Sequence, residues 1–200
     1  MTKDTRLSLV LVINLSMIAG LVLVGLLSHS IGVLSSAADY VGDAAGVGLS
    51  LVALKMSRRG RGHPRATSLA ALVNASLLLL ISLVVGVEAI DRLVLGSPEI
   101  HGLPVLIGSV IAAGAMILCA RILGSIESDD FNMRSVMLDT VADAAAAIGV
   151  AISGAIILAA DGLYRLDAAV ALAIAVVVGY HAVRLIREVL RESSPFRSRG

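Results

Sequence analysis

Six long apolar stretches run along the chain, separated by short breaks that contain polar residues, glycine and proline. Each stretch has roughly the 20 residues that a helix needs to cross the hydrocarbon core of a bilayer. Helices are expected because a backbone in lipid must satisfy its own hydrogen bonds. We therefore predict an all-α, polytopic membrane protein with six transmembrane helices, over Leu7–Leu27, Ile31–Met56, Ala66–Leu95, Leu103–Leu123, Met133–Ala160 and Leu166–Ile186.

The overall composition supports this prediction and excludes two other classes of protein. Of the 200 residues, 58% are hydrophobic and 16% are charged, whereas soluble domains have about 45–50% apolar and about 25% charged residues. A soluble multidomain enzyme and a disordered chain are therefore both excluded. We expect one six-helix transmembrane domain over residues 1–190 and a short basic cytoplasmic tail over residues 191–200, with no soluble C-terminal domain.

Lys and Arg residues are distributed unevenly between the two ends of the predicted spans. Fourteen of the 16 lie on the side that also holds both chain termini, and the other side holds only Arg92 and Arg165. Because cytoplasmic segments are enriched in Lys and Arg, we expect both termini to be cytoplasmic. The brevity of the chain and the lack of a targeting signal favour a bacterial plasma (inner) membrane. A cleaved signal peptide is the alternative for the first stretch, although that stretch has no Ala-x-Ala site.

Four carboxylates lie inside predicted spans, where charges are costly and usually functional. Asp39 and Asp43 are in the second span, and Asp139 and Asp143 are in the fifth. The i, i+4 spacing puts each pair on one face of its helix. At 1.5 Å per residue, the first pair lies roughly 12 and 18 Å from the outer end of its span, and the second about 9 and 15 Å from the inner end. Both pairs are therefore expected near the midplane, where they can face each other.

The chemistry of four neighbouring carboxylates indicates what they could bind. They cannot all stay ionised together in a low dielectric, so without a counter-ion some of them must hold protons. A divalent cation reverses this, because Asp binds metal as a carboxylate and the metal displaces the protons. Such a site has the physical requirements of a proton–metal exchanger. A cluster of neutral Asp side chains that only joins helices is the structural alternative.

Other polar residues give weaker indications. Asn14 and Asn74, in the first and third spans, could hydrogen-bond between helices or support the carboxylates. The single cysteine, Cys119, excludes an internal disulfide or a Cys-rich zinc site, and we expect it to pack in the core. Glu88 and Arg92 could form an i, i+4 ion pair. The basic loop at residues 58–65 has no interleaved aromatic residues, so nucleic-acid binding is not indicated.

Several short motifs in these spans occur together in one known family. The second span follows His29-Ser30 and carries Asp39-x-x-x-Asp43. The third reads L-A-A-L-V-N at 69–74 and E-A-I-D-R-L at 88–93, and Asn132-Met133-Arg134 precedes Asp139-x-x-x-Asp143 in the fifth. Over about Leu7 to Leu190, this pattern resembles the cation diffusion facilitator family of divalent-metal transporters.

The resemblance implies a secondary active transporter rather than an enzyme, with a tetrahedral transport site formed by Asp39, Asp43, Asp139 and Asp143. It also implies export of Zn²⁺ or another divalent cation (Mn²⁺, Fe²⁺, Cd²⁺ or Co²⁺) in exchange for protons, with no bound cofactor, by a homodimer in the lipid bilayer. The family's cytoplasmic loop commonly reads G-H-G-R-A-E. The G-H-P-R-A-T at residues 62–67 retains His63 as a candidate ligand of an accessory loop site.

The identity of the ion and two other function classes stay open at this point. Many zinc-selective members of the family have a His in the transport site, whereas this chain has only Asp. Carboxylates suit harder ions such as Mn²⁺, but Zn²⁺ also accepts Asp oxygens in a tetrahedral site. The alternatives are a structural or regulatory membrane subunit, and an intramembrane aspartyl protease with Asp39 and Asp143 as its dyad. The dyad leaves the other two Asp residues unexplained.

Overall fold

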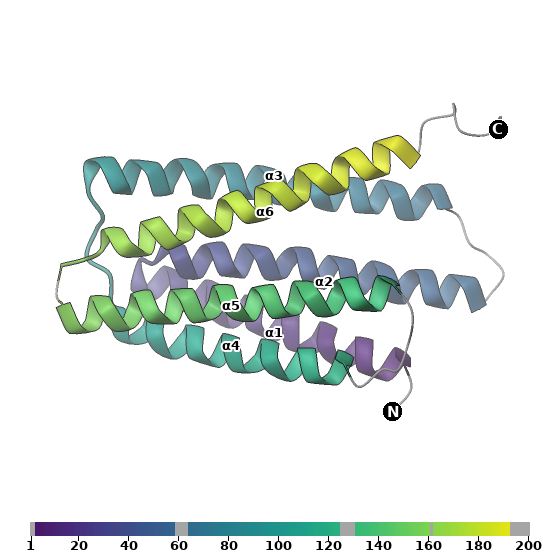
Figure 1. Cartoon of the computed structure of the whole chain (residues 1–200), viewed down its shortest axis with the longest axis horizontal. Coiled ribbons are helices and arrows are strands. Elements are labelled where there is room, and N and C mark those ends of the chain that lie inside the picture. Colours follow the sequence, from purple (N-terminus) through teal and green to yellow (C-terminus); the bar gives the residue numbers. More distant parts are fainter. Residues whose placement is uncertain (1–2, 59–63, 125–130, 161, 193–200) are drawn as a thin grey trace.

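The chain folds into long, roughly parallel and antiparallel helices (Figure 1). The computed structural model describes the backbone at residues 3–58, 64–124, 131–160 and 162–192, and the side chains at 5–48, 51–52, 72–122, 143–160 and 162–191. These residues contain no strand, which confirms the all-α class. The helices are α1 (Lys3–Ser28), α2 (Ile31–Arg58), α3 (Pro64–Leu95), α4 (Gly102–Gly124), α5 (Phe131–Ala160) and α6 (Arg165–Glu192).

The predicted and observed helices agree closely except at the end of α6. This helix continues to Glu192, six residues beyond the predicted span, so part of the segment expected as a tail is helical. The extra turns are amphipathic, and Arg184 forms an ion pair with Glu188 at 2.9 Å. An i, i+4 pair of this kind supports a helix that emerges from the apolar region.

Five of the helices are long and apolar enough to cross a membrane, judged on the described residues. The exception is α2, which carries Asp39 and Asp43 among many Gly, Ala and Ser residues. This helix contacts each of the other five helices. A helix at the centre of a bundle meets protein instead of lipid around much of its surface, so it needs fewer apolar side chains. The chain is therefore a multi-pass membrane protein whose central helix carries two carboxylates among small residues.

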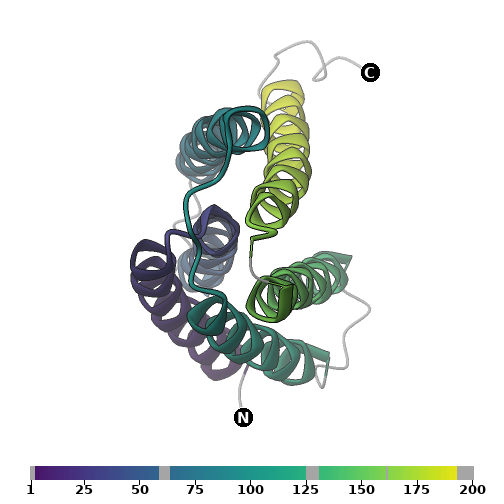
Figure 2. The same ribbon diagram turned by 90° about the vertical axis from the view of Figure 1, so that its left-hand side faces the viewer.

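The helices form two groups. Helices α1, α2, α4 and α5 make a bundle through the α1–α2, α4–α5 and α1–α4 contacts, and α3 and α6 form a separate pair that packs on α2. Figure 2 shows this pair beside the bundle. The contact between α5 and α6 is smaller than the α3–α6 contact. The α3–α6 pair is thus joined to the bundle mainly through α2.

The main hydrophobic core lies within the bundle. Its largest buried side chains include Leu21 of α1, Tyr40 of α2, Met116 of α4 and Ile157 of α5. Helices α4 and α5 approach closely at Gly154, where an added Cβ would lie 2.8 Å from the backbone nitrogen of Leu106. Small residues at such contacts let backbones come close, which is how helices gain packing energy inside a bilayer.

A buried carboxylate on α6 fixes the start of α2. Asp167 is fully buried and accepts hydrogen bonds from the Ser30 hydroxyl at 2.5 Å and from the Gly32 backbone N–H at 3.1 Å. Ser30 also caps α2, since its hydroxyl oxygen accepts a bond from the Val33 backbone N–H at 3.1 Å. Gly32 has no room for a side chain, because a Cβ there would lie 2.6 Å from Asp167 Oδ1. The N-terminal end of α2 is therefore fastened to α6.

A second polar contact fastens the same end of the molecule to α3. The predicted ion pair of Glu88 and Arg92 is confirmed, with 2.8 Å between the charged groups. Arg92 also donates a hydrogen bond to the backbone carbonyl of His29, in the turn between α1 and α2, at 2.7 Å. Together with Asp167, Arg92 joins the α1–α2 turn to both helices of the α3–α6 pair.

Replacing Asp167 tests whether this contact stabilises the fold. Asp167→Ala leaves the Ser30 hydroxyl and the Gly32 N–H buried without acceptors, so we expect the free energy of unfolding to fall by about 2 to 5 kcal/mol. Reversible unfolding of the purified chain in mixtures of detergent and dodecyl sulfate measures this free energy. The control is Asp91→Ala, because Asp91 is exposed on α3 near the same end. Equal, small effects of both substitutions would show that the Asp167 contact contributes little.

Candidate metal centre

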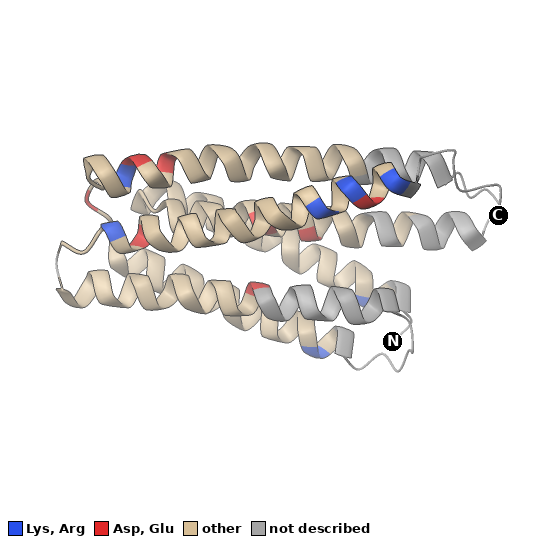
Figure 3. Cartoon of the chain, turned by 45° about the horizontal axis from the view of Figure 1, so that its top comes forward, with Lys and Arg blue, Asp and Glu red and all other residues tan. Residues whose placement is uncertain are grey.

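Three of the four predicted site carboxylates lie in the described part of the chain, on two neighbouring helices. Asp39 and Asp43 are on α2, Asp143 is on α5, and the two helices are in contact. Figure 3 shows acidic positions midway along the bundle, away from both ends. Asp39 and Asp43 are half-buried, whereas Asp143 is only 6% exposed. The i, i+4 spacing on α2 and the antiparallel course of α5 thus bring carboxylates from both helices to one level, as predicted.

These carboxylates interact directly. Asp143 is within hydrogen-bonding and electrostatic range of both Asp43 and Asp39. One oxygen of Asp143, Oδ2, is nevertheless buried without a hydrogen-bond partner among the described residues. Three acidic groups held together at this depth can be accommodated when protons or a cation offset their mutual repulsion. A two-carboxylate dyad of Asp39 and Asp143 would leave Asp43 without a role.

Tyr40 is a further polar group at this place that the sequence analysis did not assign to the site. Its side chain is 1% exposed, it interacts electrostatically with all three described aspartates, and its hydroxyl has no hydrogen-bond partner in the described structure. The sequence does contain an indication of this position, because Tyr40 directly follows Asp39 in the middle of a predicted span. A buried hydroxyl without a partner costs free energy, so its orientation beside the carboxylates calls for an explanation.

Asn14 is also buried, at 3% exposure, and its Oδ1 has no partner among the described residues. Helices α1 and α2 form an antiparallel hairpin with its turn at residues 29–30. Counting equal numbers of residues from that turn puts Asn14 near the level of Ala45, between Asp43 and Val47. Asn74 is half-buried on α3. Of the two asparagines, Asn14 therefore fits the supporting role that the sequence left open.

Cys119 of α4 forms the apolar side of this region. It is fully buried and its thiol is free, which confirms the expected packing role. It lies close enough to Asp43 and Tyr40 for electrostatic interaction. Asp43 of α2 thus lies near α4 as well as α5.

The remaining predicted site residues lie outside the described part of the chain. This applies to the side chain of Asp139, although α5 passes through that position, and to His63 in the loop between α2 and α3. Within the described side chains, no three His, Cys, Asp or Glu residues form a group that could already hold a metal ion. The four-aspartate site and the loop site therefore stay predictions.

Comparison with known proteins identifies relatives over nearly the whole chain. The family profile described as the cation efflux transmembrane domain matches residues 7–192. Zinc transporter ZitB of Yersinia pestis is 32% identical over 176 residues, which cover 84% of this chain and 55% of that protein. The cadmium, cobalt and zinc/H(+)-K(+) antiporter of Bacillus velezensis is 31% identical over 201 aligned positions, covering 93% of this chain and 64% of that protein.

A third relative, the metal cation efflux system protein CzcD of Cupriavidus metallidurans, is 28% identical over 156 residues, covering 75% of this chain and 49% of that protein. The chain thus spans about half to two-thirds of the length of the curated relatives it matches.

Substitutions of Tyr40 separate the role of its ring from that of its hydroxyl. Tyr40→Ala removes a buried aromatic ring and should lower the free energy of unfolding by about 3 to 5 kcal/mol. Tyr40→Phe keeps the ring and removes a hydroxyl that has no partner in the described part of the chain, so the free energy of unfolding should change by less than about 1 kcal/mol. The same detergent unfolding assay measures both, with Tyr180→Phe as the control because Tyr180 is exposed. A large loss in Tyr40→Phe would mean that the hydroxyl is satisfied within the fold.

Proposed function

The chain belongs to the cation efflux transmembrane domain family, and we propose that it exports a divalent transition-metal cation, Zn²⁺ foremost, in exchange for protons. The substrate site is formed by Asp39, Asp43, Asp139 and Asp143. The observation that carries this proposal is the group of three described aspartates at mid-depth, two half-buried on α2 and one buried on α5, beside a tyrosine hydroxyl without a partner among the described residues. Holding such a group inside a bilayer costs more free energy than a purely structural contact between helices requires.

Exchange follows from the chemistry of the carboxylates. Each one can hold either a proton or a share of a divalent cation, so binding of the metal releases protons and rebinding of protons releases the metal. Asp143 Oδ2, which is buried without a hydrogen-bond partner among the described residues, is available as a ligand. The Tyr40 hydroxyl and Asn14 Oδ1 are neutral oxygen atoms that would orient a carboxylate or an ion-bound water.

The ligand set and the relatives favour different ions. Oxygen ligands suit Mn²⁺ or Fe²⁺, whereas the names of the relatives specify zinc, or cadmium, cobalt and zinc. Zn²⁺ accepts Asp oxygens in tetrahedral sites and binds more tightly than Mn²⁺ or Fe²⁺ at most sites. We therefore propose Zn²⁺ as the main substrate, with Cd²⁺, Co²⁺, Mn²⁺ and Fe²⁺ as competitors.

The proposed working arrangement is a homodimer in a bacterial plasma membrane with both termini in the cytoplasm. Two basic residues mark one side and fourteen the other, in agreement with the positive-inside rule. Access would alternate by rocking of helices around the fixed midplane site. Because Ser30, Gly32 and Asp167 fasten the outer end of α2 to α6, α2 and the α3–α6 pair would move together.

Transport by the purified chain in liposomes tests the proposal. With a zinc-sensitive dye inside and an acidic interior, wild type should carry Zn²⁺ inward as protons leave. Asp43→Ala and Asp143→Ala should each reduce the initial rate to that of protein-free liposomes, because either change removes a ligand. Asp43→Asn should behave in the same way, since an amide cannot exchange a proton for a metal ion.

Asp91→Asn is the matched control, because Asp91 is an exposed carboxylate away from the site and its loss should leave the rate unchanged. Normal Zn²⁺ flux through Asp43→Ala would contradict the proposal. Normal flux through Asp43→Asn alone would favour the structural reading of the aspartates, in which hydrogen bonding suffices.

A further inference from the structure

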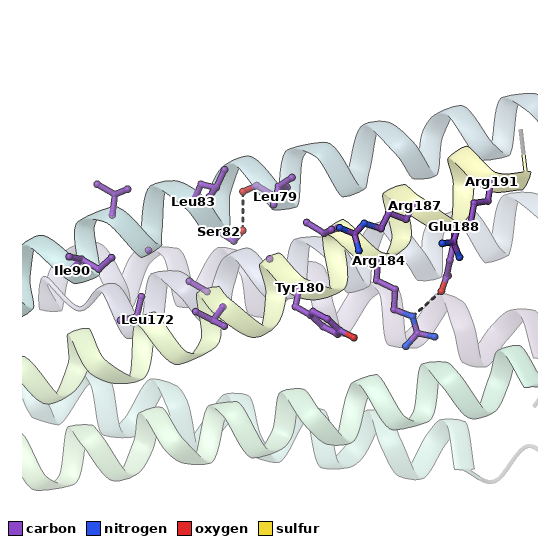
Figure 4. A pocket seen from close by; sticks show the side chains of 16 residues that line it. Leu79, Ser82, Leu83, Ile90, Leu172, Tyr180, Arg184, Arg187, Glu188 and Arg191 are labelled. Carbon is purple, nitrogen blue, oxygen red and sulfur yellow. Dashed lines mark hydrogen bonds and ion pairs between the residues drawn. The ribbon is translucent and has the colours of Figure 1, made fainter. Parts of the chain in front are cut away.

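A groove of about 730 Å³ runs along the α3–α6 pair, outside the bundle that holds the aspartates. Its walls are apolar side chains that are more than half exposed, namely Leu83 and Val87 of α3 and Val176 of α6. Its lining also includes small residues, among them Gly86 and Gly179. Figure 4 shows the two helices and the side chains that line the groove between them. In a membrane protein, a groove with exposed apolar walls opens on lipid.

The length of the apolar part matches half a bilayer. From Leu172 to Val183 on α6 the groove is lined mainly by apolar residues, a distance of about 16 Å at 1.5 Å per residue. Half of a hydrocarbon core is about 15 Å. Beyond Val183 the lining becomes charged over the next two turns, through Arg184, Arg187, Glu188 and Arg191. The groove thus has an apolar segment as long as one leaflet, followed directly by arginines.

The charges at this end do not cancel. Arg184 is paired with Glu188 at 2.9 Å, which leaves Arg187 and Arg191, both exposed. Neither of these two guanidinium groups makes a hydrogen bond or ion pair with another residue in the described part of the chain. Guanidinium groups bind phosphate through two parallel hydrogen bonds. Two of them at the interfacial end of an apolar groove complement a phosphate group that carries acyl chains.

We propose that the groove between α3 and α6 binds one anionic phospholipid, with an acyl chain along Leu83, Val87 and Val176 and the phosphate at Arg187 and Arg191. This site is separate from the aspartates and does not depend on the proposed transport. A second copy of the chain is a poorer occupant. A two-fold partner seated in the same groove would bring its own Arg187 and Arg191 to the same level, where like charges repel.

Arginines at the ends of membrane helices also serve simply to orient the chain, and the variants must separate that role from binding. Arg187→Gln/Arg191→Gln removes the phosphate contacts from exposed positions. Gly86→Leu fills the groove, and it does so without a clash, because an added Cβ at Gly86 meets no atom within 4 Å. The matched controls are Arg121→Gln, at an exposed arginine of α4, and Gly114→Leu, at an exposed glycine of α4 with the same free space.

Thermal unfolding of the purified full chain in a neutral detergent tests the proposal. Cys119 is the only cysteine and is fully buried, so a thiol-reactive dye reports unfolding directly. Phosphatidylglycerol should raise the midpoint of wild type by about 5 °C more than phosphatidylcholine with the same acyl chains. The double arginine variant should lose this difference, Gly86→Leu should lose it too, and both control variants should keep it. Soluble glycerol phosphate should give no shift, because it has no acyl chain.

Several results would overturn the assignment. Equal stabilisation by both lipids, a full shift in the double arginine variant, or an equal loss in Arg121→Gln would remove the specific headgroup contact. A shift with glycerol phosphate would identify a free-phosphate site instead. A concentration-dependent dimer that Gly86→Leu abolishes would assign the groove to a second copy.

Discussion

The repulsion among carboxylates held together inside a membrane is the constraint on which this molecule depends. Asp143 is almost completely buried and interacts with Asp39 and Asp43 across the contact of α5 with α2. Three acidic groups at this depth are tolerable only when they share protons or a cation. In the proposed function, the number of bound protons and the presence of a metal ion are linked through these carboxylates, which is the basis of exchange.

The helices are arranged so that protein, and not lipid, surrounds these carboxylates. Helix α2 carries two of the three described aspartates, and it contacts all five other helices. Close approach at small residues, as at Gly154, lets α4 and α5 pack tightly beside it. Its N-terminal end is held to α6 by Asp167 through Ser30 and Gly32. Helix α2 is thus packed against every other helix and fixed at its N-terminal end.

Much of this architecture could be predicted from the sequence, because runs of about 20 apolar residues determine helices in a bilayer. The i, i+4 spacing of Asp39 and Asp43, and the equal depth of Asp143 in the fifth span, also predicted that these groups would meet. The fastening by Asp167 could not be predicted, since it joins residues 137 positions apart. The groove beside α6 could not be predicted for the same reason. The end of α6 at Glu192 could not be read from the apolar run, because its last turns are amphipathic.

Proton release on addition of metal to the purified protein tests the central claim most directly. In a weakly buffered solution with a pH-sensitive dye, Zn²⁺, Mn²⁺ and Mg²⁺ are compared on wild type and on Asp43→Ala/Asp143→Ala. The account predicts that Zn²⁺ releases protons from wild type in the largest amount at low concentration and that the double variant releases none. Equal traces from the two proteins would contradict it, because they would mean that these aspartates do not exchange protons for metal.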